Sequence, residues 1–205
     1  MKIVIATRNR HKAVELKTLL HGAGYDAVQL DEIDPDNKIP EVEETGTTFK
    51  ENALLKAQAI AKATGLPAIG DDTGLEVDIL GGAPGIFSAR YSGENCTYED
   101  NVKKLLRELS DVPDDRRTAC FKTVAVYVHK ETELSAEGVV EGVITEKEEG
   151  VGGFGYDPVF SVLDMKKTYA QLADEEKNRV SHRGKAIRSL IEKLRENGLI
   201  ADNPS

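Results

Sequence analysis

A short apolar run, residues 66–69, leads into Gly70 and the acidic pair Asp71-Asp72, and Thr73-Gly74 follows directly. This segment constrains the fold most, because α/β enzymes use such an order to place acidic ligands at the end of a strand. A packing role explains it poorly, since Asp is seldom fully buried without a partner. The alternative is a turn or a helix cap before the glycine, and the segment alone does not separate the two.

The chain has 205 residues, which suits one sizeable domain or two tightly joined lobes. Hydrophobic residues make up 40% and aromatic residues only 5%, so we expect a core that is mainly aliphatic. The longest apolar runs fall far short of the roughly 20 residues that cross a bilayer, so no association with a membrane is expected. The first apolar stretch is too short for a signal peptide and predicts a strand, and we therefore expect a cytoplasmic protein.

The net charge of −9, from 36 acidic and 27 basic residues, disfavours a surface for DNA or RNA, which is normally basic. A small anionic substrate remains compatible with it where lysines and arginines gather locally. Cys96 and Cys120 lack the spacing of a metal site and are expected to be free thiols, with a disulfide as the alternative. The four histidines and the serines form no pattern of a nucleophilic triad, so a covalent route is not expected.

The periodicity of apolar residues predicts an α/β protein. Strands are expected over residues 2–7, 26–30, 119–129 and 134–145 and in a short segment leading to Asp71, with helices over 13–20, 47–64, 98–109 and 183–197. An acidic loop is expected over residues 31–46, and a glycine-rich loop over residues 150–155. Because α/β units at both ends flank a β-ribbon, this order predicts a mixed sheet rather than a regular doubly wound one.

The turn between the first strand and the first helix carries several polar and basic residues. They are Thr7, Arg8, Asn9, Arg10, His11 and Lys12. Backbone N–H groups and the positive end of the helix dipole suit a phosphate there, and Arg10 and Lys12 add charge. A solvated basic turn is the alternative, and no Walker pattern is present.

Four carboxylates lie near predicted strand and helix ends, namely those of Glu43-Glu44 and Asp71-Asp72. The helix between the two pairs presents Asn52 and Lys56 on one face, four residues apart. Carboxylate oxygens are the ligands that Mg²⁺ prefers, so these residues are a candidate metal site, with solvated loop acids as the alternative.

Glycines on both sides of Phe154, in the segment Gly152-Gly153-Phe154-Gly155-Tyr156-Asp157, leave an aromatic face clear of the backbone, as a platform for a base requires. A turn with incidental aromatic residues is the alternative. Further along, Lys177 and the segment Ser181-His182-Arg183 bring cations to a helix start. The helix dipole disfavours them unless a phosphate or a carboxylate lies there too.

Together these segments resemble the inosine/xanthosine triphosphate pyrophosphatase family, the Ham1-like pyrophosphatases, over nearly the whole chain. The matching motifs are Ala6-Thr7-x-Asn9-x-x-Lys12, Glu51-Asn52-Ala53-x-x-Lys56-Ala57, Asp71-Asp72-Thr73-Gly74-Leu75-Glu76-Val77, Gly82-x-Pro84-Gly85-x-x-Ser88-Ala89-Arg90-Tyr91, Phe154-Gly155-Tyr156-Asp157-Pro158-x-Phe160 and Ser181-His182-Arg183. The resemblance implies one two-lobed domain over residues 1–205, with an elongated α/β fold, a long central mixed β-sheet flanked by helices, an active-site cleft between the lobes, and a homodimer.

The resemblance also implies Mg²⁺-dependent hydrolysis of ITP, dITP and XTP to the monophosphate and pyrophosphate. Asp72 would be the general base and a metal ligand, with Glu44 or Glu43 completing the metal site and Asp71 close by. The segment from Thr7 to Lys12 and Lys56 would hold phosphates. The substrate would also contact Thr73, Phe154, Gly155, Tyr156, Asp157, Lys177, His182 and Arg183. Thr73 replaces the usual Ser of the family and keeps its hydroxyl group, while Phe87 stands where relatives often have Tyr.

Two other functions remain open from the residues alone. A nucleotide-binding protein without turnover would require loss of the carboxylates, and all four are present. A phosphatase for other phosphoesters would act on a generic phosphate ester and release orthophosphate.

Overall fold

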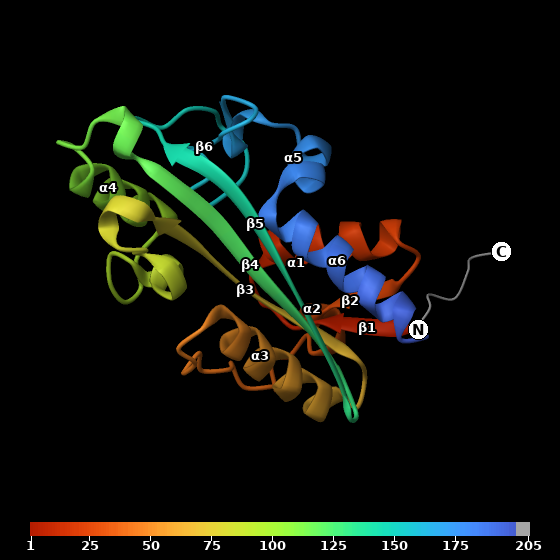
Figure 1. Ribbon diagram of the computed structural model, residues 1–205. Coiled ribbons are helices and arrows are strands. Elements are labelled where there is room, and N and C mark those ends of the chain that lie inside the picture. The colour runs from red at the N-terminus through yellow and green to blue at the C-terminus, as the bar shows by residue number, and fades with distance from the viewer. Residues whose placement is uncertain (200–205) are drawn as a thin grey trace. The chain divides into compact units, whose positions relative to one another are not determined.

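The computed structural model describes residues 1–199, which divide into two compact units that are each described by themselves (Figure 1). Unit 1 comprises residues 1–72, 123–138 and the chain from residue 183 onward. Unit 2 comprises residues 73–122 and 139–182. Each unit has a hydrophobic core whose residues all come from that unit.

Seven strands pair in the order β2-β1-β3-β4-β5-β6-β7. They are β1 (Lys2–Ile5), β2 (Asp26–Gln29), β3 (Ala68–Val77), β4 (Thr118–His129), β5 (Thr132–Ile144), β6 (Phe160–Val162) and β7 (Lys167–Thr168). Strand β1 is parallel to β2 and β3, whereas β6 is antiparallel to β5 and β7. The predicted α/β class with a mixed sheet is therefore confirmed.

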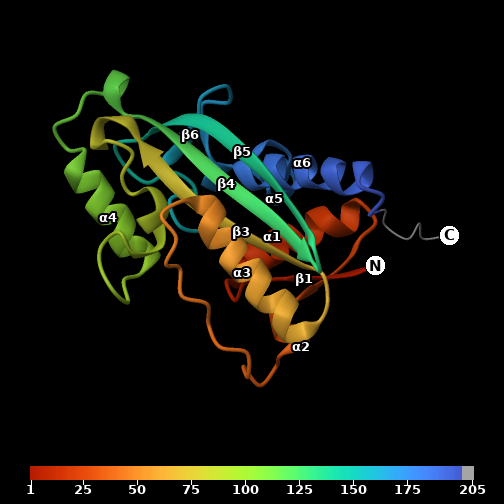
Figure 2. The same cartoon turned by 60° about the horizontal axis from the view of Figure 1, so that its bottom comes forward.

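In unit 1, helices cover both faces of β1, and successive residues of this strand point to opposite faces. Ile3 and Ile5 lie in a core with helices α1 (Arg10–Gly22) and α6 (His182–Glu196). Val4 and Ala6 lie in a second core with α2 (Leu30–Ile33) and α3 (Phe49–Thr64). Figures 1 and 2 show α3 on the other side of the strands from α1 and α6.

The core of unit 2 combines aliphatic and aromatic side chains. Helix α4 (Tyr98–Glu108) contributes Val102 and Leu105, and the second half of β3 contributes Leu75 and Val77. Phe121 packs edge-on against Phe160, with 4.7 Å between the ring centroids, which is a favoured geometry for aromatic pairs. The remaining helix of this unit, α5 (Asp174–Val180), precedes α6.

Most predicted helices and strands are present with ends shifted by a few residues. Helix α3 begins where Thr48 accepts from the backbone N–H of Glu51 and the Glu51 side chain bonds back to the N–H of Thr48, a reciprocal cap that the sequence pattern favours. The prediction of an unbroken loop over residues 31–46 is wrong, because the single-turn helix α2 (Leu30–Ile33) enters it. Helix α5 and strands β6 and β7 were not predicted.

The prediction that the acidic pair lies at the end of a strand, and its alternative of a turn, are also wrong. Asp71 and Asp72 lie inside β3 (Ala68–Val77), not in a turn or at a strand end. Asp has low strand propensity, so the local sequence favours a turn. The two carboxylates instead meet half-buried cations and a buried amide, so tertiary contacts outweigh the local preference.

Gly70 sets how closely β3 approaches α3 in unit 1. A Cβ atom at this position would lie 2.3 Å from the carbonyl oxygen of Ala53 and 2.9 Å from the backbone nitrogen of Ala57. Both atoms belong to the backbone of α3, so neither can move aside as a flexible side chain would. The absence of a side chain at Gly70 therefore lets the segment that carries the acidic pair lie directly against this helix.

We expect Gly70→Ala to lower the free energy of unfolding by about 1–3 kcal/mol, because the added methyl group overpacks the contact between β3 and α3. Gly22→Ala is the matched control, since nothing lies within 4 Å of a Cβ atom there and the residue ends α1. The control is expected to stabilise the protein by roughly 0.5–1 kcal/mol. Urea unfolding measures both, and equal effects of the two substitutions would contradict the close approach at Gly70.

Cys96 and Cys120 are both free, as predicted, and each is partly buried. Burial and the neighbouring Glu76 carboxylate raise the pKa of the Cys120 thiol to about 12. Within residues 1–199, no helix is long and apolar enough to cross a membrane.

The raised pKa predicts how Cys120 reacts with iodoacetamide. A thiol with the ordinary pKa of about 8.5 is almost fully ionised at about pH 10, so its rate of alkylation levels off there. The rate at Cys120 is expected to rise about tenfold per pH unit between pH 8 and pH 10, because the thiolate remains a minor species well below its pKa of about 12. Peptide mass spectrometry reports the rate, and a rate at Cys120 that levels off by pH 10 in the folded protein would refute the raised pKa.

Candidate active site

The acidic pair lies on β3, where successive side chains point to opposite faces of the sheet. Asp71 and Asp72 are both buried, with exposed fractions of 1% and 5%. Burial of a carboxylate is costly unless cations or hydrogen-bond donors surround it, so each Asp requires partners on its own side of the strand. The structure supplies two different sets of partners.

Asp71 binds cations from the two helices that share a core with Ile3 and Ile5. Its Oδ2 lies 3.2 Å from the Lys12 ammonium and 3.4 Å from Nε of Arg183. The Arg183 guanidinium also donates to the carboxylate of Glu15 on α1. Glu15, Arg183, Asp71 and Lys12 thus form a network in which the charges alternate, and we call it the Asp71 network. Asp71 and Arg183 are buried, whereas Glu15 and Lys12 are half-buried.

The charges of the Asp71 network shift its pKa values strongly. Burial acts to raise the pKa of Asp71, but the Lys12 and Arg183 cations outweigh it and hold the pKa well below its ordinary value. Burial lowers the pKa of Lys12, with Asp71 opposing the shift and Lys56 adding to it. Asp71 is therefore a permanent anion that keeps two cations in place.

Asp72 binds two side chains from α3 on the other side of the strand. Its Oδ2 accepts from Nδ2 of Asn52 at 3.3 Å, and its Oδ1 lies 3.5 Å from the Lys56 ammonium. Lys56 also donates to Oε1 of Glu44 at 2.9 Å, so one ammonium bridges two carboxylates. We call Asn52, Lys56, Asp72 and Glu44 the Asp72 cluster.

The pKa values of Asp72 and Lys56 are both raised. Burial raises the pKa of Asp72, and the Lys56 and Lys12 cations oppose this. Burial acts to lower the pKa of Lys56, but the Asp72, Asp71 and Glu44 charges outweigh it and place the pKa above its ordinary value. A carboxylate with a raised pKa is a stronger base than an ordinary Asp, which suits proton abstraction from water.

The donor set of the Asp72 cluster fits a magnesium ion that keeps most of its own waters. Glu44 and Asp72 share Lys56, whereas Glu43 is exposed to solvent. Among residues 1–199, no three His, Cys, Asp or Glu side chains are grouped as a complete metal cage. Mg²⁺ characteristically binds one or two carboxylates and completes its shell with waters and substrate phosphates, so the pair fits this ion.

The segment from Thr7 to Lys12 is held by its own side chains. Asn9 caps α1 by accepting from the N–H of Lys12, and the Thr7 hydroxyl accepts from the N–H of Asn9. Arg8 donates to Asp34 and to the carbonyl of Ile39, which holds the acidic loop. The other two members of the predicted phosphate segment, Arg10 and His11, are exposed.

In unit 2, Asp157 organises the glycine-rich loop. Its Oδ2 accepts from the backbone N–H of Phe154 at 2.8 Å and from the Lys177 ammonium at 2.6 Å. The same ammonium lies 4.7 Å from the centre of the Phe154 ring, a cation–π arrangement. Gly153 has a φ of 71°, and a Cβ atom there would lie 2.0 Å from Oδ2 of Asp157, so only glycine fits at this close approach.

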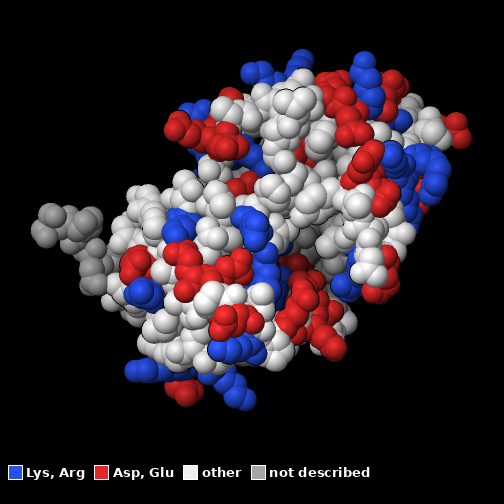
Figure 3. Space-filling view, turned by 180° about the vertical axis from the view of Figure 1, so that it is seen from behind, with Lys and Arg blue, Asp and Glu red and all other residues white. Residues whose placement is uncertain are grey.

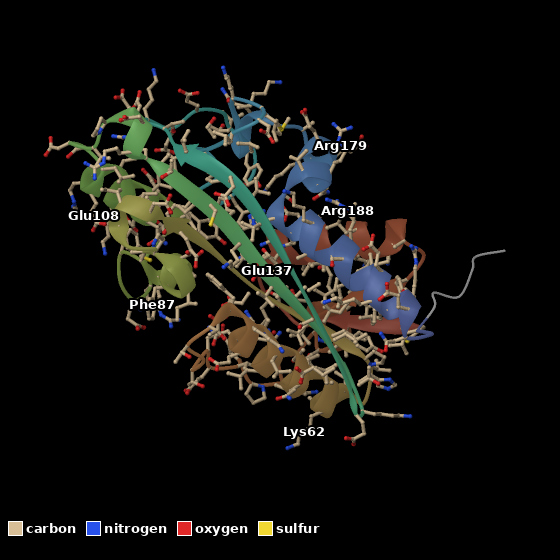
Figure 4. All side chains as sticks on the ribbon, viewed as in Figure 1. Lys62, Phe87, Glu108, Glu137, Arg179 and Arg188 are labelled. Carbon is tan, nitrogen blue, oxygen red and sulfur yellow. The ribbon has the colours of Figure 1, made fainter. Side chains whose placement is uncertain are left out.

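The other predicted site residues of unit 2 differ in burial. His182 is buried, stacks on Phe121 at 4.5 Å between ring centroids, and lies 3.3 Å from the Tyr169 hydroxyl. Tyr156 is buried and donates to the carbonyl of Ser88. Thr73 and Gly155 are half-buried. Phe87, which is labelled in Figure 4, is 53% exposed. The Arg90 guanidinium lies over its ring, 5.4 Å from the centroid.

The positive charges near the start of α6 are compensated by carboxylates. Arg183 meets Glu15 and Asp71, and Lys177, which lies on α5, meets Asp157. The anion that we expected next to these cations is therefore supplied by the carboxylates of the protein itself. No local pattern indicated Glu15, which is 168 positions from Arg183 and resembles any polar residue of an amphipathic helix.

A model of the Ham1 family matches residues 3–193. The chain belongs to the Ham1 family. It is 54% identical to the dITP/XTP pyrophosphatase of Salmonella paratyphi A, over 95% of this chain and 98% of that protein. It is 52% identical to the dITP/XTP pyrophosphatase of Escherichia coli K12 over the same shares.

Solved structures of Ham1 proteins are similar to this fold as well. The Ham1 protein of Staphylococcus aureus has a TM-score of 0.83 at 42% identity, covering 96% of this chain and all of that one. A dITP/XTP pyrophosphatase from Mycobacterium abscessus has a TM-score of 0.73 at 42% identity, covering 95% of this chain and 99% of that one. The Ham1 family, and the α/β fold with a central mixed sheet and flanking helices, are therefore confirmed.

Arg183→Met is expected to lower the free energy of unfolding by about 3–5 kcal/mol, because it removes one partner of a buried ion network and leaves two carboxylates facing an apolar side chain. Lys103→Met is the control, since Lys103 forms an exposed pair with Glu99 on α4. Exposed pairs contribute little, so this variant is expected to unfold like the wild type. Urea unfolding that gives the same stability for both variants would show that the Asp71 network contributes nothing.

Proposed function

We propose that this chain hydrolyses deaminated purine nucleoside triphosphates, namely dITP, ITP and XTP, to the monophosphate and pyrophosphate. The observation that carries the proposal is the buried Asp72 of a Ham1-family chain, held by Asn52 and Lys56 with the Glu44 carboxylate on the same ammonium. The names of relatives 52–54% identical to this chain support the substrate class.

In the proposed reaction, a water molecule attacks the α-phosphorus. Asp72 accepts a proton from this water, a bond forms between the water oxygen and phosphorus, and the bond from phosphorus to the bridging oxygen of pyrophosphate breaks. The leaving group departs with the electron pair of that bond. The protein forms no covalent intermediate, so its contribution is positioning and charge stabilisation.

Positive groups of unit 1 would stabilise the charge on the phosphates. Lys56 and Lys12 are the two ammonium groups next to the acidic pair, and Asp71 keeps Lys12 in place. Mg²⁺ bound by Asp72 and Glu44 would supply further positive charge to the phosphate oxygens. The sequence also predicted Glu43 and Asp71 as metal ligands. Because Asp71 already binds two cations, the proposal gives it the role of positioning Lys12 and Arg183.

Recognition of the base is assigned to groups of unit 2. Phe154 would stack on the purine, with Gly155, Tyr156, Asp157 and Lys177 supporting that face. A donor in the segment His182-Arg183 would bind the 6-keto oxygen of hypoxanthine or xanthine and meet the amino group of adenine unfavourably. Arg183 is engaged by carboxylates, so the proposal assigns the donation to His182. An unpaired donor costs ~1–3 kcal/mol, which corresponds to roughly 5- to 150-fold discrimination.

The remaining substrate contacts are proposed for Thr73 and for the segment Thr7, Arg8, Asn9, Arg10 and His11.

We further propose one two-lobed domain that forms a homodimer in the cytoplasm and binds neither DNA nor RNA. The free thiols Cys96 and Cys120 are consistent with a reducing compartment. The net charge of −9, and the intermixed acidic and basic side chains on the face in Figure 3, support the absence of a nucleic-acid surface.

A product assay tests the function. Purified protein with Mg²⁺ is expected to release pyrophosphate from dITP, ITP and XTP. It is expected to act far more slowly on ATP. Removal of Mg²⁺ by a chelator is expected to stop turnover until Mg²⁺ is restored. Release of orthophosphate, or activity on p-nitrophenyl phosphate, would indicate a phosphatase. Binding of dITP without any product would indicate a nucleotide-binding protein.

Asp72→Asn tests the base. The substitution keeps the shape of the side chain but removes the proton acceptor, and loss of general-base catalysis lowers kcat by about 10²–10⁴-fold. Asp111→Asn, at an exposed position of unit 2, is the matched control and is expected to retain wild-type kcat. Circular dichroism checks that both variants fold. Near-normal turnover by a folded Asp72→Asn protein would rule out Asp72 as the base.

A further inference from the structure

Asn52 lies in the first turns of α3 and is 1% exposed. Its amide makes two contacts that lead to different parts of unit 1. Oδ1 accepts from the backbone N–H of Gly46 at 2.8 Å, and Nδ2 donates to Oδ2 of Asp72 at 3.3 Å. Gly46 follows Glu44 by two residues, so one buried amide joins the segment of Glu44 to the carboxylate of Asp72.

The two contacts require the chemistry of an amide. A backbone N–H can only donate and an ionised carboxylate can only accept, so the linking side chain must accept at one end and donate at the other. This requirement also fixes the orientation of the Asn52 amide, because a flipped amide would place donor against donor at Gly46. Asp at this position would accept from Gly46 but face Asp72 with a second negative charge.

Gly46 is shaped to permit the link. A Cβ atom on Gly46 would lie 2.7 Å from Oδ1 of Asn52 and 2.6 Å from Cβ of Glu51. A side chain there would therefore push the amide away from the backbone N–H. The close approach at Gly46 and the bridging amide at position 52 belong to one arrangement.

The contact with Asn52 at Oδ2 also determines the direction in which the other carboxylate oxygen of Asp72, Oδ1, points. Since Asn52 holds Oδ2, the carboxylate is turned so that Oδ1 faces Lys56, which also binds Glu44. Rotation of the Asp72 carboxylate and the position of the Glu44 segment are thus both fixed by α3. Loss of a hydrogen bond that orients a functional carboxylate typically lowers activity by about 10- to 100-fold.

We infer that Asn52 is a positioning residue for the hydrolysis: it locks the Asp72 carboxylate and the Glu44 segment together, so that the reacting carboxylate is oriented before substrate binds. This inference rests on the proposed pyrophosphatase function. The proposed site gives Asn52 no contact with the phosphates or the base. Its loss therefore reduces turnover and leaves the affinity for the nucleotide largely intact.

The test compares Asn52→Leu, Asn52→Asp and Gly46→Ala with matched controls on the same helix. Gln58→Leu and Gln58→Glu make the corresponding changes at an exposed amide of α3. With dITP at saturating Mg²⁺, each Asn52 variant and Gly46→Ala are expected to lose about 10- to 100-fold in kcat. The KM is expected to stay within about threefold of wild type, and so is the Kd of an analogue with an imido group between the α- and β-phosphates, measured by calorimetry.

The outcomes separate the inference from the function beneath it. A wild-type protein that releases no pyrophosphate would overturn both. A working wild type, with Asn52 variants as active as the Gln58 variants, would overturn the role of Asn52 alone. A rise in KM and analogue Kd at unchanged kcat would overturn it as well, because Asn52 would then act in binding. Should Asn52→Leu fail to fold in a thermal unfolding assay, the near-isosteric Asn52→Asp and the loop variant Gly46→Ala carry the test.

Discussion

The structure of unit 1 depends on the alternation of side chains along β3, which sends two adjacent carboxylates to opposite faces of the sheet. Each buried charge requires its own compensation. Asp71 obtains it from Lys12 and Arg183, and Asp72 obtains it from Lys56 and Asn52. One dipeptide thereby ties helices α1, α6 and α3 to the same strand.

The two faces provide different chemistry from the same residue type. On one face, Asp71 is enclosed by cations that hold its pKa far below the ordinary value, which makes it a fixed anion. On the other face, burial raises the pKa of Asp72, so this carboxylate is the better proton acceptor. In the reaction we propose, this separation gives Asp71 a structural role and leaves the carboxylate of Asp72 to accept the proton.

The sequence predicted much of the fold for reasons that are local. Helices α3 and α4 have apolar residues at helical spacing and begin with capping boxes at Thr48 and Thr97. Both features involve residues that are close together in the sequence. The course of β3 was not predictable, because Asp disfavours a strand and its compensation comes from distant residues.

The candidate site divides in the same way. Motifs predicted Lys12, Lys56, Asp72 and Phe154 as candidate site residues, but nothing local indicated that Glu15 would bind Arg183, 168 positions away. The separation of Asp71 from Asp72 likewise appears only when the strand is known to continue through them. Burial and long-range pairing, which spacing does not encode, account for what was missed.

In the proposed reaction, water activated at Asp72 attacks the α-phosphorus. Hydrolysis of dITP in water enriched in ¹⁸O, with mass spectrometry of both products, tests this attack directly. We expect the label to enter the nucleoside monophosphate and pyrophosphate to carry none. Label in pyrophosphate, with an unlabelled monophosphate, would place the attack on the β-phosphorus instead.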